Sequence, residues 1–334
     1  MKVAIYGAGA MGTVLGAHLS RAGQQVDLIT RNISHINALK QRGATVVGTV
    51  NFTVPVSALL PGEMTEKYDI VFLMTKQREN KSTVKFLLDY LAEDGVICTT
   101  QNGLPEMDII EVCGENKCVG CAISWGATFV GEGVAELTSS PDKLTFAIGS
   151  LQGNNPKLSL IQSILEKMGK VTVEQNFIGA RWAKLCVNSA FSSISAITGL
   201  TFGEVAKKLA SRKVAQAILN EAFTVATKSG VKVEKIQGHD LKKLLGYTNP
   251  IKKAISFMLI PLAMKKHKNL KSGMLFDLLK GKKCDIDFIN GAIVGVAKKC
   301  GVKTPVNDAV LAIAHKIEQG ELSVSPNNLK LIKI

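Results

Sequence analysis

Six residues near the start of the chain have the spacing of a phosphate-binding loop. In a G-x-G-x-x-G sequence the first glycine permits a tight turn, and the second lets backbone amides approach a pyrophosphate. The third lets the next helix pack close to the sheet, and that helix adds the positive end of its dipole. A glycine-rich turn of some other α/β protein is the alternative. The predicted dinucleotide-binding residues are Gly7, Ala8, Gly9, Ala10, Met11 and Gly12.

The residues after the second predicted strand favour one dinucleotide. NAD enzymes usually carry Asp or Glu there, where the carboxylate accepts hydrogen bonds from the ribose hydroxyls. This chain has Arg31 instead, and Asp27 lies too early in the strand to replace the acid. Because a guanidinium can pair with a 2′-phosphate through two hydrogen bonds, Arg31 predicts NADPH. The alternative is an ordinary solvated arginine at a strand end.

A second set of polar residues recurs along one predicted helix, residues 178–198. Lys184, Asn188, Ser192 and Ser195 stand at i, i+4, i+8 and i+11, so a regular helix places them on one face. Apolar residues surround them, and desolvation lowers the pKa of a lysine in such a setting. A lowered pKa suits a proton donor near neutral pH. The alternative is a lysine whose stem packs while its ammonium reaches water.

The elements that position these residues are strands that alternate with helices. This alternation is typical of a doubly wound, mainly parallel sheet. The predicted strands are 2–6, 25–29, 69–74, 95–100 and 171–173, with β segments at 45–47, 52–54, 117–129, 134–137 and 144–148. The predicted helices among them are 13–22, 34–42, 80–91, 104–113 and 156–168. Lys76 and Asn102 follow two strand ends, where such sheets bind ligands. Either could instead be a plain loop residue.

From residue 178 onward the pattern predicts helices alone. Their ranges are 178–198, 206–229, 239–245, 250–266, 274–279, 285–300 and 306–319. The predicted fold class is therefore α/β, with an N-terminal Rossmann-type doubly wound sheet and a C-terminal all-α domain. The predicted domains are 1–175, which binds the dinucleotide, and 176–334, which carries substrate and catalytic residues.

Charge and composition narrow the class of protein. The net charge is +14, and residues 171–334 hold 26 Lys and Arg against 11 Asp and Glu. Twelve of these residues form lysine pairs, arginine is rare, and no aromatic residues are interleaved with them, so nucleic-acid binding is disfavoured. Solvated helix faces are the plain interpretation, and attraction of an anionic substrate and cofactor is the other.

The cysteines and the apolar stretches indicate a cytoplasmic protein without a membrane segment. Cys118 and Cys121 form a lone C-x-x-C inside a predicted strand, where alternation points them to opposite faces. Free thiols in a reducing compartment are therefore expected, and a metal site is not. The longest apolar stretch, 254–264, is too short to span a bilayer. The first strand begins at the N-terminus, which leaves no room for a targeting peptide.

These motifs, in order along nearly the whole chain, resemble the ketopantoate reductase (2-dehydropantoate 2-reductase) family. Besides the glycine loop, Arg31 and Lys76, they are 101–103 (QNG), 182–188 (WAKLCVN), 272–277 (SGMLFD) and 285–291 (DIDFING). The resemblance implies NADPH as cofactor, reduction of ketopantoate to pantoate for coenzyme A synthesis, and a small anionic 2-oxo acid as substrate. It is compatible with a homodimer.

The resemblance also implies roles for single residues. Lys184 is the implied proton donor, and Asp285 the carboxylate that orients the ribose or the lysine. Asn102 is the implied contact of both nicotinamide and substrate, and Lys76 and Ala127 are further expected cofactor contacts. The remaining expected substrate contacts are Asn188, Ser192 and Ser272.

Four positions depart from the family pattern, all near the expected substrate. Asp285 stands where the family usually has Glu, and Gly273 where it has a second serine. Ser192 replaces an expected asparagine, and Phe202 a polar residue. Each change removes or retracts a hydrogen-bonding group, which buried recognition tolerates poorly. Poor reduction of ketopantoate is therefore predicted, with a better substrate among other 2-oxo acids. The alternative is that Ser193, Ser195, Ser272 or Asn269 replaces the lost contacts, and ketopantoate stays the best single guess. Asp285 could also be only a helix N-terminal residue favoured by the dipole.

The sequence thus predicts an NADPH-dependent reductase of a small 2-oxo acid. Lys184 donates the proton, and its ammonium stabilises the developing alkoxide. One alternative is an opine-like or β-hydroxyacid dehydrogenase that acts on another oxo acid or an imine and shares the Lys-x-x-x-Asn helix. Another is a catalytically idle NADPH sensor, which would have no use for an isolated Lys184.

Overall fold

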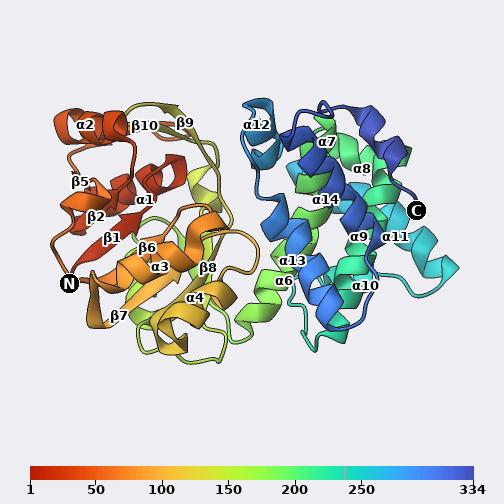
Figure 1. Ribbon diagram of the computed structural model, residues 1–334, viewed down its shortest axis with the longest axis horizontal. Helices are drawn as coiled ribbons and strands as arrows, with labels where there is room; N and C mark the ends of the chain where they lie inside the picture. The colour runs from red at the N-terminus through yellow and green to blue at the C-terminus, as the bar shows by residue number, and fades with distance from the viewer. Residues whose placement is uncertain (237) are drawn as a thin grey trace. The chain divides into compact units, whose positions relative to one another are not determined.

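The computed structural model describes residues 1–236 and 238–334, which form two compact units (Figure 1). The first unit contains residues 1–101 and 105–177, and the second contains residues 102–104 and 178–334. The first is built on a mainly parallel sheet and the second on helices. The predicted fold class is confirmed.

An eight-stranded sheet forms the centre of the first unit, in the order β12-β11-β8-β7-β6-β1-β2-β5. Neighbouring strands run parallel except β8 and β11, which are antiparallel. The carboxyl ends of β2, β1, β6 and β7 therefore share one edge. The strands are β1 (Val3–Tyr6), β2 (Val26–Ile29), β5 (Ser57–Leu59), β6 (Tyr68–Leu73), β7 (Leu91–Thr99), β8 (Cys118–Ile123), β11 (Thr145–Gly149) and β12 (Lys170–Val173).

Helices cover both faces of this sheet and bury two separate apolar cores. One core takes residues from α1 (Ala10–Arg21), α2 (Ile33–Arg42) and α5 (Leu158–Leu165). The other takes residues from α3 (Asn80–Leu88) and α4 (Glu106–Cys113). Cys118 belongs to the second core and Cys121 to the first, so the two thiols of the C-x-x-C point to opposite faces, as predicted.

A smaller, four-stranded sheet packs beside α1. Its order is β4-β3-β10-β9, with β3 and β10 parallel and the other neighbours antiparallel. The predicted β segment at 117–129 is thus divided, because β8 lies in the large sheet and β9 in the small one. The strands are β3 (Ala44–Gly48), β4 (Phe52–Val54), β9 (Ala127–Gly131) and β10 (Val134–Leu137).

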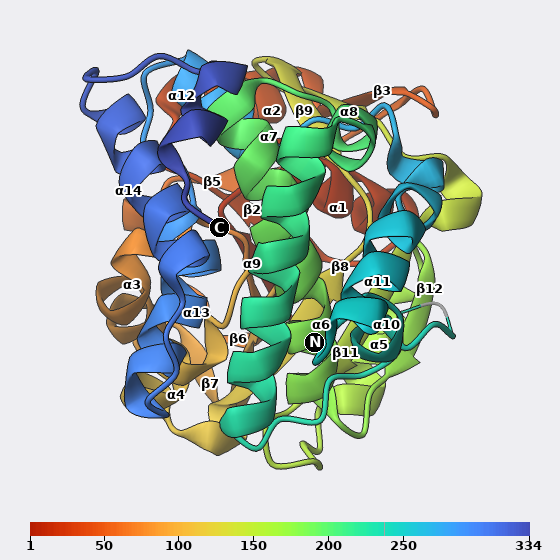
Figure 2. The same ribbon diagram turned by 90° about the vertical axis from the view of Figure 1, so that its right-hand side faces the viewer.

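The second unit is helical, and α9 runs through its middle with α11 on one side and α13 and α14 on the other (Figure 2). The predicted helix 206–229 is two helices, because Lys208 is extended and separates α8 from α9. In the described part of the chain, no helix combines the length and apolarity needed to cross a bilayer. The helices are α6 (Phe177–Val187), α7 (Ser193–Thr198), α8 (Phe202–Lys207), α9 (Leu209–Lys228), α10 (Leu241–Leu245), α11 (Pro250–Ala263), α12 (Gly273–Leu279), α13 (Ile286–Lys299) and α14 (Pro305–Glu318).

Candidate active site

The glycine loop joins β1 to α1, and packing within the unit requires glycine at two of its three glycine positions. Gly7 has a φ of +111°, and a Cβ there would lie 2.5 Å from the backbone nitrogen of Thr75. A Cβ at Gly12 would lie 2.5 Å from the carbonyl oxygen of Gly7, so only glycine lets α1 start this close to the loop. A Cβ at Gly9 would point into open space. That open space at Gly9 is where a ligand can approach the backbone.

The amino end of α1 is arranged to receive an anion. Gly9 is the N-cap residue, so the first backbone N–H groups of the helix depend on water or a ligand for their acceptors. The N–H groups of Gly7 and Ala8 are tied to the carbonyl of Ile29, at 2.8 and 2.9 Å, which fixes the loop to the end of β2. These observations fit a pyrophosphate, with Ala10 and Met11 in the first turn.

Arg31 follows β2 at the same edge of the sheet. Its side chain is 74% exposed, and its guanidinium lies 3.0 Å from the carboxylate of Glu79. The next residue, Asn32, caps α2 by accepting a hydrogen bond from the His35 N–H at 3.2 Å. The cap fixes the backbone beside Arg31 and leaves its side chain largely exposed to solvent, next to Glu79.

Lys76 is held at this edge by a buried amide pair that the sequence did not reveal. The carbonyl of Thr75, the residue before Lys76, accepts a hydrogen bond from Gln101 Nε2 at 2.7 Å. Gln101 and Asn80 also exchange two side-chain hydrogen bonds, of 2.8 and 3.0 Å. Because Gln101 immediately precedes Asn102, one side chain fixes both the loop after β6 and the chain that leads to Asn102.

Two further predicted cofactor contacts lie in different places. Ala127 begins β9 and packs on the same apolar core as Met11, so the small sheet brings it to the side of α1. Asn102 is exposed and groups with the second unit.

Three predicted catalytic and substrate residues form the accessible side of a buried helix in the second unit. Lys184, Asn188 and Ser192 are partly exposed, as is Val187, whereas the other residues of 181–198 are buried. A polar, accessible line on a helix that is otherwise core marks a place for a ligand. The helix belongs to an apolar core that includes Trp182.

The predicted helix 178–198 is interrupted by a π-helical turn, Asn188–Ser192, in which the Ser193 N–H donates to the Asn188 carbonyl five residues earlier. Such a turn accommodates one extra residue. In a regular helix at 100° per residue, Ser192 would lie about 80° from Lys184 around the helix axis. One extra residue in the turn reduces that angle to about 20°, and it places Ser195 about 80° from Lys184. Ser195 is accordingly buried, so it does not share the accessible side.

Ser195 instead supports another predicted substrate residue, Ser272. Its hydroxyl accepts a hydrogen bond from the Ser272 N–H at 3.1 Å. Ser272 is itself buried and caps α12, because its hydroxyl accepts from the Met274 N–H at 3.2 Å. The structure therefore gives Ser272 a capping role that the sequence pattern did not indicate.

A buried polar chain holds the π-helical turn. The carbonyl of Ser189, inside the turn, accepts hydrogen bonds from the Ser193 hydroxyl and from Asn290 Nδ2, the latter at 3.1 Å. Asn290 also donates to Asn307 Oδ1 at 3.0 Å, and Asn307 donates to Glu221 at 2.7 Å. Asn290 lies within the 285–291 motif, which is the signal that could have identified it.

Glu221 ends this series of buried hydrogen bonds and caps α14. Its two carboxylate oxygens accept from the backbone N–H groups of Val306 and Asn307, both at 2.9 Å. Burial raises the pKa of Glu221, and these hydrogen bonds oppose the rise by stabilising the ionised form. The carboxylate thus serves the fold rather than the accessible line of the helix.

Three of the departures from the family pattern lie in different environments: a helix end, an open position and the edge of the apolar core. Asp285 is the partly buried N-cap residue of α13, a position consistent with the helix-dipole alternative. A Cβ at Gly273 would meet open space, so a larger residue fits there. Phe202 packs its ring 6.2 Å from that of Phe191. The apolar ring therefore joins the core of the helical unit.

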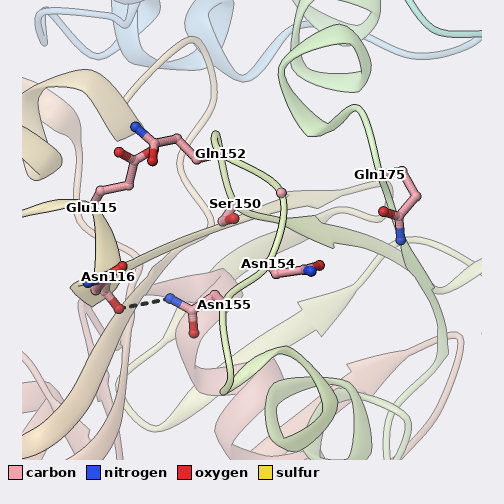
Figure 3. Close-up of a pocket in the computed structure, with 8 residues that line it drawn as sticks. Glu115, Asn116, Ser150, Gln152, Asn154, Asn155 and Gln175 are labelled. Atoms are coloured by element: carbon pink, nitrogen blue, oxygen red, sulfur yellow. Dashed lines mark hydrogen bonds between the residues drawn. The ribbon is translucent and has the colours of Figure 1, made fainter.

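A cavity of about 310 Å³ lies elsewhere in the first unit (Figure 3). It is lined by residues that precede β8 and follow β11 and β12. Because β8 runs parallel to β7 and antiparallel to β11, these residues lie at the edge opposite the glycine loop. Its buried amide, Asn155, already donates to the Asn116 carbonyl at 2.8 Å and accepts from the Lys157 N–H. This cavity is separate from the glycine loop of the same unit.

Known proteins match the chain along nearly its whole length. A family model described as ketopantoate reductase PanE/ApbA matches residues 3–151, and the corresponding C-terminal model matches residues 176–318. The 2-dehydropantoate 2-reductase of Pyrococcus horikoshii is 30% identical over 323 residues, which cover 95% of this chain and 98% of that protein.

Solved structures share the fold. A PanE/ApbA family ketopantoate reductase from Ralstonia eutropha superposes with a TM-score of 0.81 at 25% identity, over 96% of this chain and 99% of the other. A D-mandelate dehydrogenase solved with NADH and anilino(oxo)acetate has the same TM-score and coverage at 23% identity. The second likeness shows the fold alone.

Proposed function

This chain belongs to the ketopantoate reductase family, and from that premise we propose that it reduces ketopantoate, or a closely related 2-oxo acid, with NADPH. The reaction class, an NADP-dependent reduction of a 2-oxo acid, follows from the family. The observation that carries the finer proposal is the accessible line Lys184, Asn188 and Ser192 on an otherwise buried helix. Those three groups can donate a proton and hydrogen-bond a small hydroxy acid.

In this proposal the first unit provides the cofactor contacts except Asn102, which groups with the second unit. The open backbone at Gly9 and the amino end of α1 receive the pyrophosphate, and Arg31 pairs with the 2′-phosphate. Lys76, Asn102 and Ala127 complete the contacts. When bound, NADPH supplies the hydride that reduces the carbonyl carbon.

The second unit supplies the acid–base chemistry. Lys184 Nζ donates a proton to the carbonyl oxygen, and its positive charge stabilises the alkoxide as that oxygen becomes negative. Asn188 and Ser192 orient the substrate beside it, since they follow Lys184 along the same side of the helix. Asp285 orients the lysine or the cofactor ribose.

A bulkier or more apolar 2-oxo acid is the second candidate substrate. The open space at Gly273 supports it, because the missing serine leaves both room and one hydroxyl fewer. Losing a hydrogen bond to a buried substrate group costs about 1–3 kcal/mol. Two such losses would lower the specificity for ketopantoate about a hundredfold.

The test is NADPH oxidation, followed by absorbance, with ketopantoate beside a graded series of 2-oxo acids and imines. A kcat/KM for ketopantoate above about 10⁴ M⁻¹s⁻¹, not exceeded by any competitor, would establish ketopantoate as substrate. A tenfold better competitor would establish the second candidate. Tight NADPH binding without turnover on any carbonyl or imine would contradict the reductase proposal and favour a sensor.

A further inference from the structure

The imidazole ring of His35 joins three elements of the first unit. His35 belongs to the first turn of α2 and is 1% exposed. Its Nε2 lies 2.9 Å from the Thr13 hydroxyl of α1, and its Nδ1 accepts the N–H of Gly133, in the turn between β9 and β10, at 2.9 Å. A buried ring that uses both nitrogens holds the three elements together, because breaking either contact leaves a buried polar group without a partner.

The two contacts also determine where the ring carries its proton. Because Nδ1 accepts a hydrogen bond, the neutral ring is protonated on Nε2, which therefore donates to the Thr13 hydroxyl oxygen. The Glu132 carboxylate lies 3.5 Å from Nδ1, but burial is the larger effect and lowers the pKa of His35. The ring is thus neutral at about pH 7. Each nitrogen has its own partner, so the two contacts can be removed separately.

Thr13 connects the ring to the glycine loop. It is the residue directly after Gly12, and its side chain is buried. Its backbone N–H donates to the carbonyl of Gly9, the N-cap residue of α1, at 2.8 Å. The bond from His35 therefore ends within one helical turn of the open backbone at Gly9, where the pyrophosphate is proposed to bind.

The capped start of α2 connects the ring to Arg31. Asn32 accepts the His35 N–H on its side chain at 3.2 Å, and its carbonyl accepts the Ile36 N–H at 3.0 Å. These two bonds close the helical turn that begins directly after Arg31. Because the ring at the end of that turn contacts Thr13, the backbone of Arg31 is held at a set distance from the glycine loop.

We propose that the hydrogen bond from His35 to Thr13 is a positioning contact that favours NADPH, because it sets the spacing between Arg31 and the glycine loop. The inference rests on the proposed function, in which the 2′-phosphate meets Arg31 and the pyrophosphate meets the loop. A ligand that engages two contacts already held at the right spacing gains affinity from that preorganisation. NADH lacks the 2′-phosphate, so the spacing matters less for NADH. His35 acts here through other residues and does not itself contact the phosphate.

The Gly133 contact has a separate purpose, which is to hold the turn between β9 and β10. Arg42 also donates to the Glu132 carbonyl of this turn at 3.0 Å, and the Gly133 carbonyl accepts the Thr45 N–H at 2.9 Å. The turn therefore keeps two hydrogen bonds when the contact to Nδ1 is lost. The spacing of the two phosphate contacts thus depends on Nε2 rather than on Nδ1.

Two conservative variants distinguish the ring nitrogens. The amide nitrogen of Gln can take the place of Nε2, and the carbonyl oxygen of Asn can take the place of Nδ1. The probe is adenosine 2′,5′-bisphosphate, which carries a phosphate for each contact, and calorimetric titration measures its affinity. His35→Asn should weaken its binding about 3- to 10-fold, the range for one neutral hydrogen bond. His35→Gln should bind it like the wild type.

Adenosine 2′-monophosphate and adenosine 5′-monophosphate are the matched control ligands. Each engages only one of the two contacts, so its affinity does not depend on their spacing. Both should bind His35→Asn as they bind the wild type. If His35→Asn weakens the monophosphates as much as the bisphosphate, the ring supports the fold in general and the inference is wrong.

Thr13→Val tests the other end of the bond, because it removes the hydroxyl and keeps the shape of the side chain. It should weaken bisphosphate binding as His35→Asn does. The double variant should be no weaker than either single variant, since both changes remove the same contact. Fully additive losses would contradict the proposal.

Tyr68→Phe is the matched control variant. The Tyr68 hydroxyl donates to the Asp27 carboxylate at 2.8 Å, and Tyr68 begins β6 at the edge of the sheet opposite the glycine loop. The variant loses a hydrogen bond in the same unit and should keep its affinity for the bisphosphate. Unchanged bisphosphate binding in a folded His35→Asn variant would overturn the inference alone. A wild-type chain that binds neither the bisphosphate nor NADPH would contradict the proposed function, and the inference with it.

Discussion

The guanidinium of Arg31 lies 3.0 Å from the carboxylate of Glu79, at the edge of the sheet where the glycine loop begins. Both side chains are mostly exposed, so the pair itself contributes about 0–1 kcal/mol to stability. The pair bears instead on which nicotinamide cofactor the site prefers. The carboxylate would compete with a 2′-phosphate for the guanidinium and would repel that phosphate, whereas it would tolerate a 2′-hydroxyl.

Opposite effects are therefore expected from the two partners. Arg31→Ala should raise the KM for NADPH far more than that for NADH, by the roughly 10- to 150-fold that corresponds to about 1.5–3 kcal/mol. Glu79→Gln should shift the ratio of kcat/KM values toward NADPH by about two- to fivefold. Steady-state kinetics with both cofactors measures these ratios.

Lys81→Ala is the matched control for this pair. Lys81 forms an ion pair of similar exposure with Glu111 in the same unit. The control should leave the cofactor ratio unchanged. If Arg31→Ala affects NADPH and NADH equally, Arg31 does not read the 2′-phosphate.

Lys184→Ala should reduce turnover about 10²- to 10⁴-fold, the usual range for a general acid. NADPH affinity, measured by fluorescence titration, should stay within a few-fold, since Lys184 belongs to the helical unit. Lys184→Arg should also be slow, because a guanidinium keeps the charge but does not release a proton near neutral pH. Turnover that survives in Lys184→Ala would assign the proton to another donor.

Asn290→Leu should raise the KM for the 2-oxo acid or lower kcat by at least about tenfold, because the π-helical turn loses its side-chain brace and Ser192 moves relative to Lys184. Asn328→Leu is the matched control. Asn328 is a buried asparagine whose side chain donates to two backbone carbonyls, at 2.8 and 2.9 Å, outside the turn. Both variants should lose about 1–3 kcal/mol of stability. Equal kinetic losses in both would show that the turn has no special role.

Gly273→Ser combined with Ser192→Asn should raise kcat/KM for ketopantoate about 10- to 100-fold if the departures weaken recognition. Gly273 has room for the added side chain. Gly291→Ser on α13 is a control whose added Cβ also meets only ordinary contacts, 3.6 Å or longer. No gain in the double variant would mean that neighbouring residues already supply the contacts.

Stability should fall as the pH is lowered below about 7, in part through His35. Its Nδ1 accepts the Gly133 N–H at 2.9 Å and its Nε2 meets the Thr13 hydroxyl at 2.9 Å, which requires a neutral ring. Burial lowers the pKa of His35, although Glu132 opposes the shift. The unfolded chain therefore takes up a proton near pH 6.5 that the folded chain refuses, and stability is lost as the pH falls through that range.

Thermal unfolding between pH 7.5 and 5.5 tests this dependence. The slope from one histidine is at most about 1.4 kcal/mol per pH unit. His35→Gln should be less stable at pH 7.5 and should show a shallower pH dependence. Burial also lowers the pKa of His18, so part of the slope should remain. A variant with the full wild-type slope would exclude His35 as a contributor.

Local patterns in the sequence were sufficient to predict much of the fold. The strand–glycine–helix start, the parallel strands and the helical second half were predictable because each depends on nearby residues. The amide pair of Gln101 and Asn80 joins residues 21 apart, and the bond from Asn290 to Ser189 spans 101 residues. Such contacts depend on the completed fold, so no periodicity reveals them.

The π-helical turn explains the principal error within the candidate site. The predicted helix, 178–198, has 21 residues. Hydrophobic spacing alone cannot show whether such a segment is an uninterrupted α-helix or contains a turn with one extra residue. The expectation that Ser195 shares a face with Lys184 assumed a constant 100° per residue. Lys184, which precedes the turn, and Asn188, which begins it, were unaffected by that assumption.

The turn at Asn188–Ser192 also affects how relatives should be aligned. A relative whose helix is uninterrupted here needs one residue fewer to join the same two ends, so its alignment to this chain requires a gap inside the turn. Without that gap every later position of the helix is compared with the wrong neighbour. Deleting a single residue there would let both flanking helices stay packed, while changing which side chains stand on the same side of the helix as Lys184.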